Sequence, residues 1–371
     1  MLSHNQEAFL ALVRAGLWEN EVRLSLFKCI DYSAIYQFAE EQTVVGLVAA
    51  GLEHVVDVKV PQKHALSFVG ATLQLEQKNS AMNKFIGELV ENLRQRDVYT
   101  LLIKGQGNAQ CYKRPLWRSC GDVDLFLSDE NYQKATTILS AKAFITEEEI
   151  SYKQHRAFYI DEWEVELHGS LKGGLWHCLN RTLDEVKKAV VCEGNVRSWM
   201  NGNTQVFLLG ENEDIFFVFA HILQHFFVEG IGLRQICDWC RLLWTYKDSL
   251  KLDLLETRIK NSKVMSEWKV FASLAVDYLG MPKDAMPFYS SNKKWGWKAK
   301  KIIDNILKTG SFGHNRDMAY IANSPYVIRK AKSFGGHLRM MLHRVGIFPK
   351  DAIVAWVYTM AHSMKTMAKG K

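Results

Sequence analysis

The chain has 371 residues, of which 48% are hydrophobic and 23% are charged, and this composition excludes a disordered or fibrous protein. Its longest uncharged stretches, Ile215–Val228 and Ala352–Met364, are shorter than the roughly 20 apolar residues of a membrane-spanning helix, so no transmembrane segment is expected. The seven scattered cysteines are typical of a reduced protein. We therefore expect a cytoplasmic location, with association at the inner surface of a membrane as the alternative.

Positive charge is concentrated near the C-terminus. Residues 291–371 contain 16 Lys and Arg against three Asp, a net charge of +13, whereas the other 290 residues carry −6. This asymmetry is typical of a surface for nucleic acid, anionic lipid or a phosphorylated substrate, although a solvated basic tail explains it equally well. Aromatic residues that alternate with the basic ones would suit nucleic acid or a membrane surface, or would belong to the core: Trp295, Trp297, Tyr320, Tyr326, Phe334, Phe348 and Trp356.

The first part of the chain, residues 1–97, is predicted to be a helical region. Ser3 and Gln6 have the spacing of a capping box, and the apolar residues that follow recur at helical intervals. The same periodicity predicts further helices over Glu21–Phe27, Tyr32–Glu41, Val44–His54 and Gln62–Gln95.

Residues 98–210 are predicted to form a small α/β core. Val98–Ile103 is a β-branched and aromatic run, which indicates a buried strand that ends at Gly105. In Asp122–Leu127 acidic and apolar residues alternate, so a strand would place both aspartates on one face. A helix and two paired strands are predicted next, over Asn131–Lys142, Ala157–Ile160 and Trp163–His168.

The remainder of the chain is predicted to be helical again. Residues 211–290 would pack on the core, with helices over Ile215–Val228, Leu233–Tyr246 and Ser266–Leu279. Residues 291–371 would form a basic region of two or three helices. The expected fold class is therefore α+β and mostly helical, with a small mixed β-sheet between N-terminal and C-terminal helical regions.

The acidic strand is the first candidate for chemistry. Asp122 and Asp124 lie two residues apart, which suits a hard divalent cation held by oxygen ligands. A third carboxylate from the later strand, either Glu166 or Glu164, would complete a two-metal site for phosphoryl displacement. A solvated acidic face paired with basic residues is the alternative for the two aspartates.

The groups around these carboxylates would suit a triphosphate. Gly105 lets backbone N–H groups approach phosphate, and Lys104 and Arg118 are placed to neutralise its charge. Lys104 could equally be an ordinary lysine at a strand end, and Arg118 could pair with Asp122 in the absence of ligand.

The chain combines a strand that ends at a glycine turn, a strand with two aspartates, and a third acid on a later strand. This order of elements resembles the DNA-polymerase-β-like nucleotidyltransferase superfamily. A closer resemblance is to a bacterial family of uncharacterised nucleotidyltransferases, through five short segments: Ile103–Gly105, Tyr112, Arg118, Gly121–Leu125 and Glu166–His168. His221 and His225 match the family's His-x-x-x-His helix, and Leu233, Arg234 and Asp238 match the helix that follows it.

The resemblance implies a fold and an activity. Asp122 and Asp124 would bind Mg²⁺, Glu166 would complete the metal site and align or activate an acceptor hydroxyl, and Gly105 would hold phosphate. The implied reaction transfers a nucleoside monophosphate from an NTP to an unidentified small molecule, glycan or protein and releases pyrophosphate. One departure is that Gln106 follows Gly105, where the superfamily usually has Ser or Gly. This difference puts the geometry of the phosphate-binding loop in doubt.

Two further pairs lie at helical spacing. His221 and His225, with Glu229 one turn later, have a spacing that can bind zinc, but a lining of the substrate cleft is the favoured interpretation, together with His168. Arg234 and Asp238 would form a helix-surface ion pair or orient substrate. Cys237 and Cys240 form a C-x-x-C motif with the sequence Cys237-Asp-Trp-Cys240. Packing in the core is the favoured role for these cysteines, rather than redox or metal chemistry.

Three functions follow from these patterns. The first is a Mg²⁺-dependent nucleotidyltransferase. The second is a binding module that keeps the fold without turnover, which the departure at Gln106 suggests. The third is a basic protein that binds a membrane or nucleic acid through residues 291–371.

Overall fold

A computed structural model describes residues 2–150, 154–310, 338 and 340–368, with side chains described up to residue 358. The N-terminal helices are α1 (His4–Trp18), α2 (Tyr32–Glu41), α3 (Val45–Glu53) and α4 (Gln62–Arg94). The shorter helices among the strands are α5 (Gly105–Ala109), η1 (Pro115–Trp117), α6 (Asp129–Ser140) and α7 (His177–Val191). The later helices are α8 (Glu211–Val228), α9 (Leu233–Thr245), α10 (Leu252–Asn261), α11 (Met265–Leu279), η2 (Lys283–Ala285), α12 (Lys293–Thr309) and α15 (Pro349–Ala368).

Within the described residues, seven strands form one mixed sheet. They are β1 (Leu101–Ile103), β2 (Asp122–Phe126), β3 (Ile145–Thr146), β4 (His155–Ile160), β5 (Trp163–His168), β6 (Val196–Asn201) and β7 (Thr204–Leu209). Their order in the sheet is β3-β4-β5-β2-β1-β7-β6. β2 is parallel to β5 and antiparallel to β1, while β7 is parallel to β1. The expected α+β, mostly helical fold with a small mixed sheet is confirmed.

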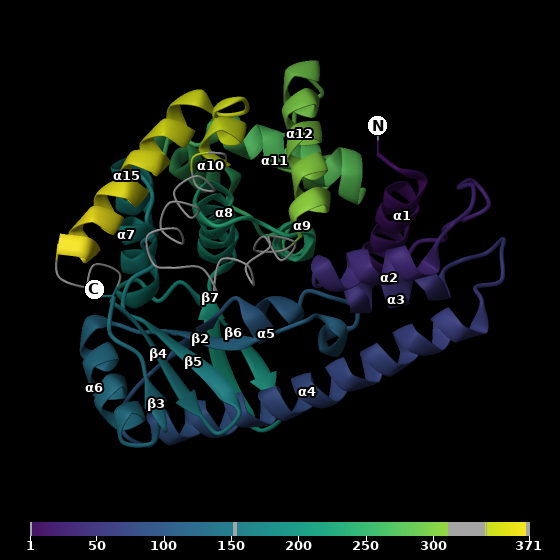
Figure 1. The fold of residues 1–371 in the computed structure, drawn as a ribbon. Helices are drawn as coiled ribbons and strands as arrows, with labels where there is room; N and C mark the ends of the chain where they lie inside the picture. The colour runs from purple at the N-terminus through teal and green to yellow at the C-terminus, as the bar shows by residue number, and fades with distance from the viewer. Residues whose placement is uncertain (1, 151–153, 311–337, 339, 369–371) are drawn as a thin grey trace.

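The two faces of the sheet have different partners. Helix α4 runs beneath the sheet in Figure 1, and it shares a hydrophobic core with α6 and the apolar strand residues, among them Val123, Leu125 and Val165. Helices α8 and α9 lie on the opposite side, above the sheet in the same view, and belong to a larger core with α1, α3 and α11. Because side chains alternate along a strand, the acidic residues of β2 and β5 point toward α8 and α9.

Most of the predicted N-terminal helices are confirmed, and one is wrong. Ser3 and Gln6 form the expected capping box of α1. The segment Glu21–Phe27 is not helical, because its backbone groups bond to a distant loop. The N–H of Leu24 donates to the carboxylate of Asp57, and Val22 pairs with the strand-like segment at Val55. These tertiary contacts outweigh a short helical pattern.

The sequence patterns missed the segment between β5 and α8. It contains α7, which packs on α8, and the hairpin β6–β7, which extends the sheet beyond β1. In β6 apolar and polar residues do not alternate, because one face is exposed and the other is only partly buried.

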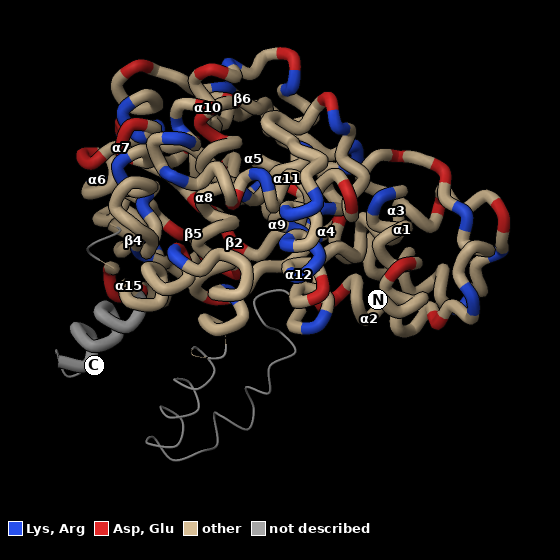
Figure 2. Tube along the Cα trace, turned by 90° about the horizontal axis from the view of Figure 1, so that it is seen from above, with Lys and Arg blue, Asp and Glu red and all other residues tan. Residues whose placement is uncertain are grey.

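The basic C-terminal region is only partly described. α12 carries lysines along its length (Figure 2), and α15 packs against α8. Phe348 is buried in the larger core, whereas Trp297 is exposed. Residues 311–337, which include the candidate aromatics Tyr320, Tyr326 and Phe334, lie outside the described residues. No helix in the described part of the chain is long and apolar enough to cross a bilayer.

Candidate active site

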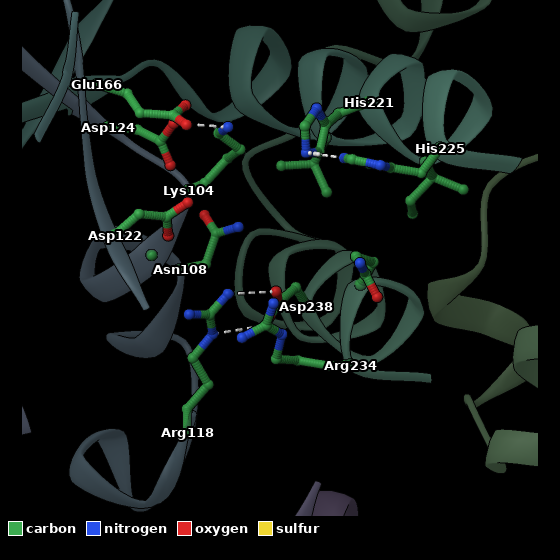
Figure 3. Close-up of a pocket in the computed structure, with 14 residues that line it drawn as sticks. Lys104, Asn108, Arg118, Asp122, Asp124, Glu166, His221, His225, Arg234 and Asp238 are labelled. Atoms are coloured by element: carbon green, nitrogen blue, oxygen red, sulfur yellow. Dashed lines mark hydrogen bonds and ion pairs between the residues drawn. The ribbon is translucent and has the colours of Figure 1, made fainter. Parts of the chain in front are cut away.

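A cavity of about 220 Å³ lies between the acidic face of the sheet and helices α8 and α9 (Figure 3). The strand side and its loops contribute Lys104, Gly105, Asn108, Arg118, Asp122, Asp124 and Glu166. The helical side contributes Val218, His221, Ile222, His225, Arg234, Gln235 and Asp238. Apart from His168, which lies behind the acidic wall, the residues expected to bind metal, phosphate or substrate all line this cavity.

The three carboxylates meet because of strand register. β2 and β5 are parallel neighbours, and Asp124 lies directly opposite Glu166 in the ladder. Asp122 is two residues earlier on the same face of β2. One oxygen of each of these three side chains lies within 4.8 Å of the others.

Glu164, the competing third acid, lies on the same face of β5 but opposite Asp122. Its carboxylate accepts a hydrogen bond of 3.1 Å from the Tyr159 hydroxyl on β4, and it does not line the cavity. The geometry therefore places Glu166, rather than Glu164, with the two aspartates.

Lys104 is the cation at the centre of the acidic cluster. Its Nζ is 2.7 Å from Oδ1 of Asp124, which is only 2% exposed. The backbone of Lys104 has φ = 59°, in the left-handed region that residues with a side chain rarely adopt. Strain of this kind persists where the surrounding structure holds it, and here it occurs at the residue whose ammonium group contacts Asp124.

Two histidines support the same carboxylates from behind. Nε2 of His168 is 2.8 Å from Oδ1 of Asp124 and 3.3 Å from Oε2 of Glu166. Nε2 of His155 is 3.0 Å from that same Oε2. Burial alone would raise the pKa of Glu166, but the hydrogen bonds from His155 and His168 and the charge of Lys104 hold it well below its usual range.

Asp122 has the opposite electrostatic environment. The negative charge of Asp124, together with burial, raises the pKa of Asp122 despite the nearby charge of Lys104. A carboxylate whose charged form is disfavoured by its neighbours gains most from an added cation. Asp122 is therefore the carboxylate of this cluster whose negative charge is least compensated by its neighbours.

Arg118 pairs with Asp238 and not with Asp122. The two form a two-point ion pair, 3.1 Å from Nε to Oδ1 and 2.7 Å from Nη2 to Oδ2, and the Tyr112 hydroxyl donates to Oδ1 at 2.8 Å. Both charged side chains are buried. The expectation of an ion pair between Arg234 and Asp238 on a helix surface is therefore wrong, because α9 turns both residues inward.

Arg234 is left without an acidic partner. Its Nη1 donates to the carbonyl oxygen of Ser119 at 2.8 Å, while its Nε has no hydrogen-bond partner. Within the described residues no carboxylate lies within 4.0 Å of its guanidinium. Burial and the neighbouring Arg118 lower the pKa of Arg234, and the charges of Asp238 and Asp122 offset this only in part.

His221 and His225 bond to each other along α8. Their Nε2 atoms are 2.8 Å apart, and Nδ1 of His225 is 2.9 Å from the carboxylate of Glu229 (Figure 3 shows the histidine pair). Burial and the charge of Lys104 lower the pKa of His221 well below its usual value, so this ring is neutral at pH 7. The arrangement is the expected one of hydrogen-bonded histidines in a cleft.

The cysteines do not form a site. Cys237 and Cys240 are buried in the larger core, and burial raises the pKa of both thiols. All seven cysteines of the sequence lie in the described part of the chain, and none forms a disulfide.

Sequence reasoning missed three residues of this region. Asn108 and Gln235 line the cavity, and His155 contacts Glu166. A signal for His155 was present: the tight turn between Ile160 and Trp163 sets the hairpin register, which places His155 opposite His168. Gln106, the departure from the superfamily pattern, is buried and donates to Oδ1 of Asn79 on α4 at 2.7 Å, so its role is to fix the loop.

The mixed sheet with three convergent carboxylates beside a strand–glycine–helix turn is the arrangement that the resemblance to nucleotidyltransferases predicts. The family model described as "Uncharacterised nucleotidyltransferase" matches residues 28–280, and the chain belongs to this family. No curated protein and no solved structure matches the chain.

Proposed function

We propose that the protein is a Mg²⁺-dependent nucleotidyltransferase that moves a nucleoside monophosphate from an NTP to a hydroxyl or phosphate acceptor and releases pyrophosphate. Membership of the family supports the transferase class. The observation that carries the proposal is the convergence of Asp122, Asp124 and Glu166 in one cavity that also contains cationic side chains.

The donor set fits magnesium. Asp122, Asp124 and Glu166 offer carboxylate oxygens, which Mg²⁺ prefers, and these lie within 4.8 Å of one another. These three residues would hold the ions of a two-metal site. Bound there, magnesium supplies charge neutralisation for the phosphates and for the oxygens at the reacting phosphorus.

The cavity's charge supports a polyanionic substrate. Its walls carry four carboxylates and the three cations Lys104, Arg118 and Arg234. Two divalent ions would reverse the net negative charge of this set and match a triphosphate. In the proposal Lys104, Gly105 and Arg118 bind the phosphates, and Arg234 provides the cation that no carboxylate of the described chain neutralises.

In the proposed reaction an acceptor oxygen forms a bond to the α-phosphorus, and the bond from that phosphorus to the β-bridging oxygen breaks, so that pyrophosphate leaves. Glu166 aligns the acceptor, and when the acceptor is a hydroxyl its proton passes to bulk water, because a carboxylate whose pKa is held this low is a weak base. The hydrogen bonds of His155 and His168 to Glu166 keep that carboxylate ionised and oriented. His168, His221, His225 and Asp238 surround or support the substrate cleft in this proposal.

Titration calorimetry with Mg²⁺ and non-hydrolysable NTP analogues tests nucleotide binding. We expect the wild type to bind at least one analogue, and Asp122→Asn and Asp124→Asn to weaken that binding at least about 100-fold, since each removes a charged ligand. Glu164→Gln is the matched control, because Glu164 shares a strand face with Glu166 yet does not line the cavity. Absence of nucleotide binding, or equal binding by all variants, contradicts the proposal.

Turnover is tested separately with labelled NTPs and cell extract. Pyrophosphate release and a labelled acceptor that Asp124→Asn abolishes support the transferase, and fractionation then separates small molecules, glycans and proteins. Tight nucleotide binding without transfer to any acceptor supports the catalytically silent binding module.

The basic C-terminal region remains a separate proposal for an anionic partner. Within the described residues α12 carries six lysines, Lys293, Lys294, Lys298, Lys300, Lys301 and Lys308. Retention on anionic vesicles or on oligonucleotides at graded salt tests it, because binding through these charges must weaken steeply as salt rises. Retention of neither at low salt excludes such a partner.

A further inference from the structure

Two histidines and a glutamate converge behind the acidic wall of the cavity. His155 on β4 and His168 on β5 lie opposite each other in the antiparallel ladder, with ring centroids 4.8 Å apart. Both imidazoles contact the same oxygen. Oε2 of Glu166 is 3.0 Å from Nε2 of His155 and 3.3 Å from Nε2 of His168.

These spacings are those of ligands around one metal ion. When metal–ligand bonds measure about 2.0–2.2 Å, neighbouring ligand atoms lie roughly 2.9–3.6 Å apart. Both imidazole–carboxylate distances fall in that range, and the three ligand atoms lie within 4.8 Å of one another. An ion could be held here with little movement of the chain.

The donor chemistry differs from that of the aspartate side. Imidazole nitrogen with one carboxylate suits zinc and similar transition metals, whereas magnesium prefers oxygen alone. We propose that His155, Glu166 and His168 form a transition-metal site, which adjoins the magnesium site of Asp122 and Asp124 through the Glu166 carboxylate. A carboxylate has two oxygens, so Glu166 is able to serve both sides.

The surroundings permit an ion to enter and stay. The side chains of His155, Glu166 and His168 are 18%, 22% and 15% exposed, so they are shielded but not sealed. All three residues stand on paired strands, which position ligands more rigidly than a loop does. Oδ1 of Asp124, 2.8 Å from Nε2 of His168, is a further oxygen at the edge of the group.

This inference goes beyond the transferase function and does not depend on it. Metal retention is measured without nucleotide, so a failure to turn over NTPs leaves the metal result intact. Conversely, a protein that transfers nucleotides with Mg²⁺ alone and retains no transition metal disproves only the site of His155 and His168.

The test uses the full chain, stripped with a chelator and titrated with Co²⁺ and Zn²⁺ in excess Mg²⁺. We expect about one transition-metal ion per chain, a visible Co²⁺ absorption band, and nitrogen scattering from imidazole in the X-ray absorption spectrum of the zinc-loaded wild type. His155→Ala and His168→Ala should each weaken Co²⁺ binding by more than about 100-fold, beyond the loss of an outer-shell partner.

His54→Ala is the matched control. His54 also pairs with a glutamate, Glu19, at 2.8 Å, but this pair belongs to no group of three metal-binding side chains in the described chain. It should leave Co²⁺ affinity unchanged. The proposal is overturned if the wild type retains no transition metal against Mg²⁺, if its spectrum lacks imidazole ligands, or if the folded His155 and His168 variants bind Co²⁺ within about 100-fold of the wild type.

Discussion

Arg118 and Asp238 form a buried two-point ion pair that joins the loop before β2 to helix α9. The shorter of its two contacts, between Nη2 and Oδ2, measures 2.7 Å. Because Asp238 is occupied by Arg118 and by the Tyr112 hydroxyl, it does not neutralise Arg234, one turn earlier on the same helix. One ion pair therefore fixes α9 against the strand core and leaves Arg234 on the cavity wall without an ion-pair partner among the described residues.

Replacement of Arg234 should weaken nucleotide binding without weakening the fold. In Arg234→Met the affinity for an NTP analogue should fall roughly 10- to 100-fold. This corresponds to the loss of one hydrogen bond to a charged group, which contributes about 1.5–3 kcal/mol. The Tm of the ligand-free protein should stay level or rise, because a buried cation without a carboxylate partner disappears. Calorimetry and thermal unfolding measure the two effects.

Arg241→Met provides the control on the same helix. Arg241 donates to the carbonyl oxygens of Cys111 and Leu17 and does not line the cavity. Its replacement should lower the Tm and leave nucleotide affinity within about twofold of the wild type. If both variants lose affinity equally, the role assigned to Arg234 is wrong.

Removal of one partner of the buried ion pair should destabilise the protein strongly. Asp238→Leu leaves Arg118 without a counter-charge and should lower the free energy of unfolding by about 3–5 kcal/mol. The double variant Arg118→Met, Asp238→Leu should lose clearly less than the sum of the two single variants, since no unpaired charge remains. Urea unfolding of the four proteins in this cycle gives the coupling, and strict additivity would contradict the pairing.

Acid should destabilise the fold through His221. Burial and the nearby charges of Lys104 and His225 lower the pKa of His221 well below its usual value in the folded protein. The unfolded chain therefore binds a proton at His221 near pH 6.5 while the folded chain does not, so stability falls as the pH drops below that value. Between pH 7.5 and 5.5 this loss should reach about 1 kcal/mol.

His221→Gln isolates this contribution. The variant loses the contact to His225 and should be less stable than the wild type at pH 7.5. The difference in free energy of unfolding should shrink at pH 5.5. At that pH the wild type is destabilised because His221 is protonated in the unfolded chain and neutral in the folded one, and the variant has no such group. Chemical unfolding of both proteins at the two pH values measures the difference, and a constant difference would show that His221 titrates normally.

Asp122→Asn should make the metal-free protein more stable and the proposed enzyme inactive. The charge of Asp124 and burial raise the pKa of Asp122, so the ionised form destabilises the fold once the pH exceeds the unfolded value near 4. In EDTA at pH 7 the variant should therefore have a Tm a few degrees above the wild type, with little difference at pH 4. Added Mg²⁺ should reverse the order, because it binds the wild type better. A lower Tm in EDTA would contradict the repulsion between Asp122 and Asp124.

Local sequence patterns were enough to predict much of the core. Alternation in Asp122–Leu127 and Trp163–His168 identified both acidic strands and the face that each acid occupies, because the two-residue period of a strand is local. Helical periodicity likewise identified α8 and α9. The fold class follows from these elements.

The partners across the cavity were decided only by the tertiary structure. Nothing in the sequence says that Glu166 rather than Glu164 stands opposite Asp124, since that depends on the register of two parallel strands joined by a long connection. Nor does it say that Asp238 meets Arg118, 120 positions away, instead of its helical neighbour Arg234. Periodicity fixes which way a side chain points within its own element, whereas the packing of elements against one another decides which charges meet and which is left for a ligand.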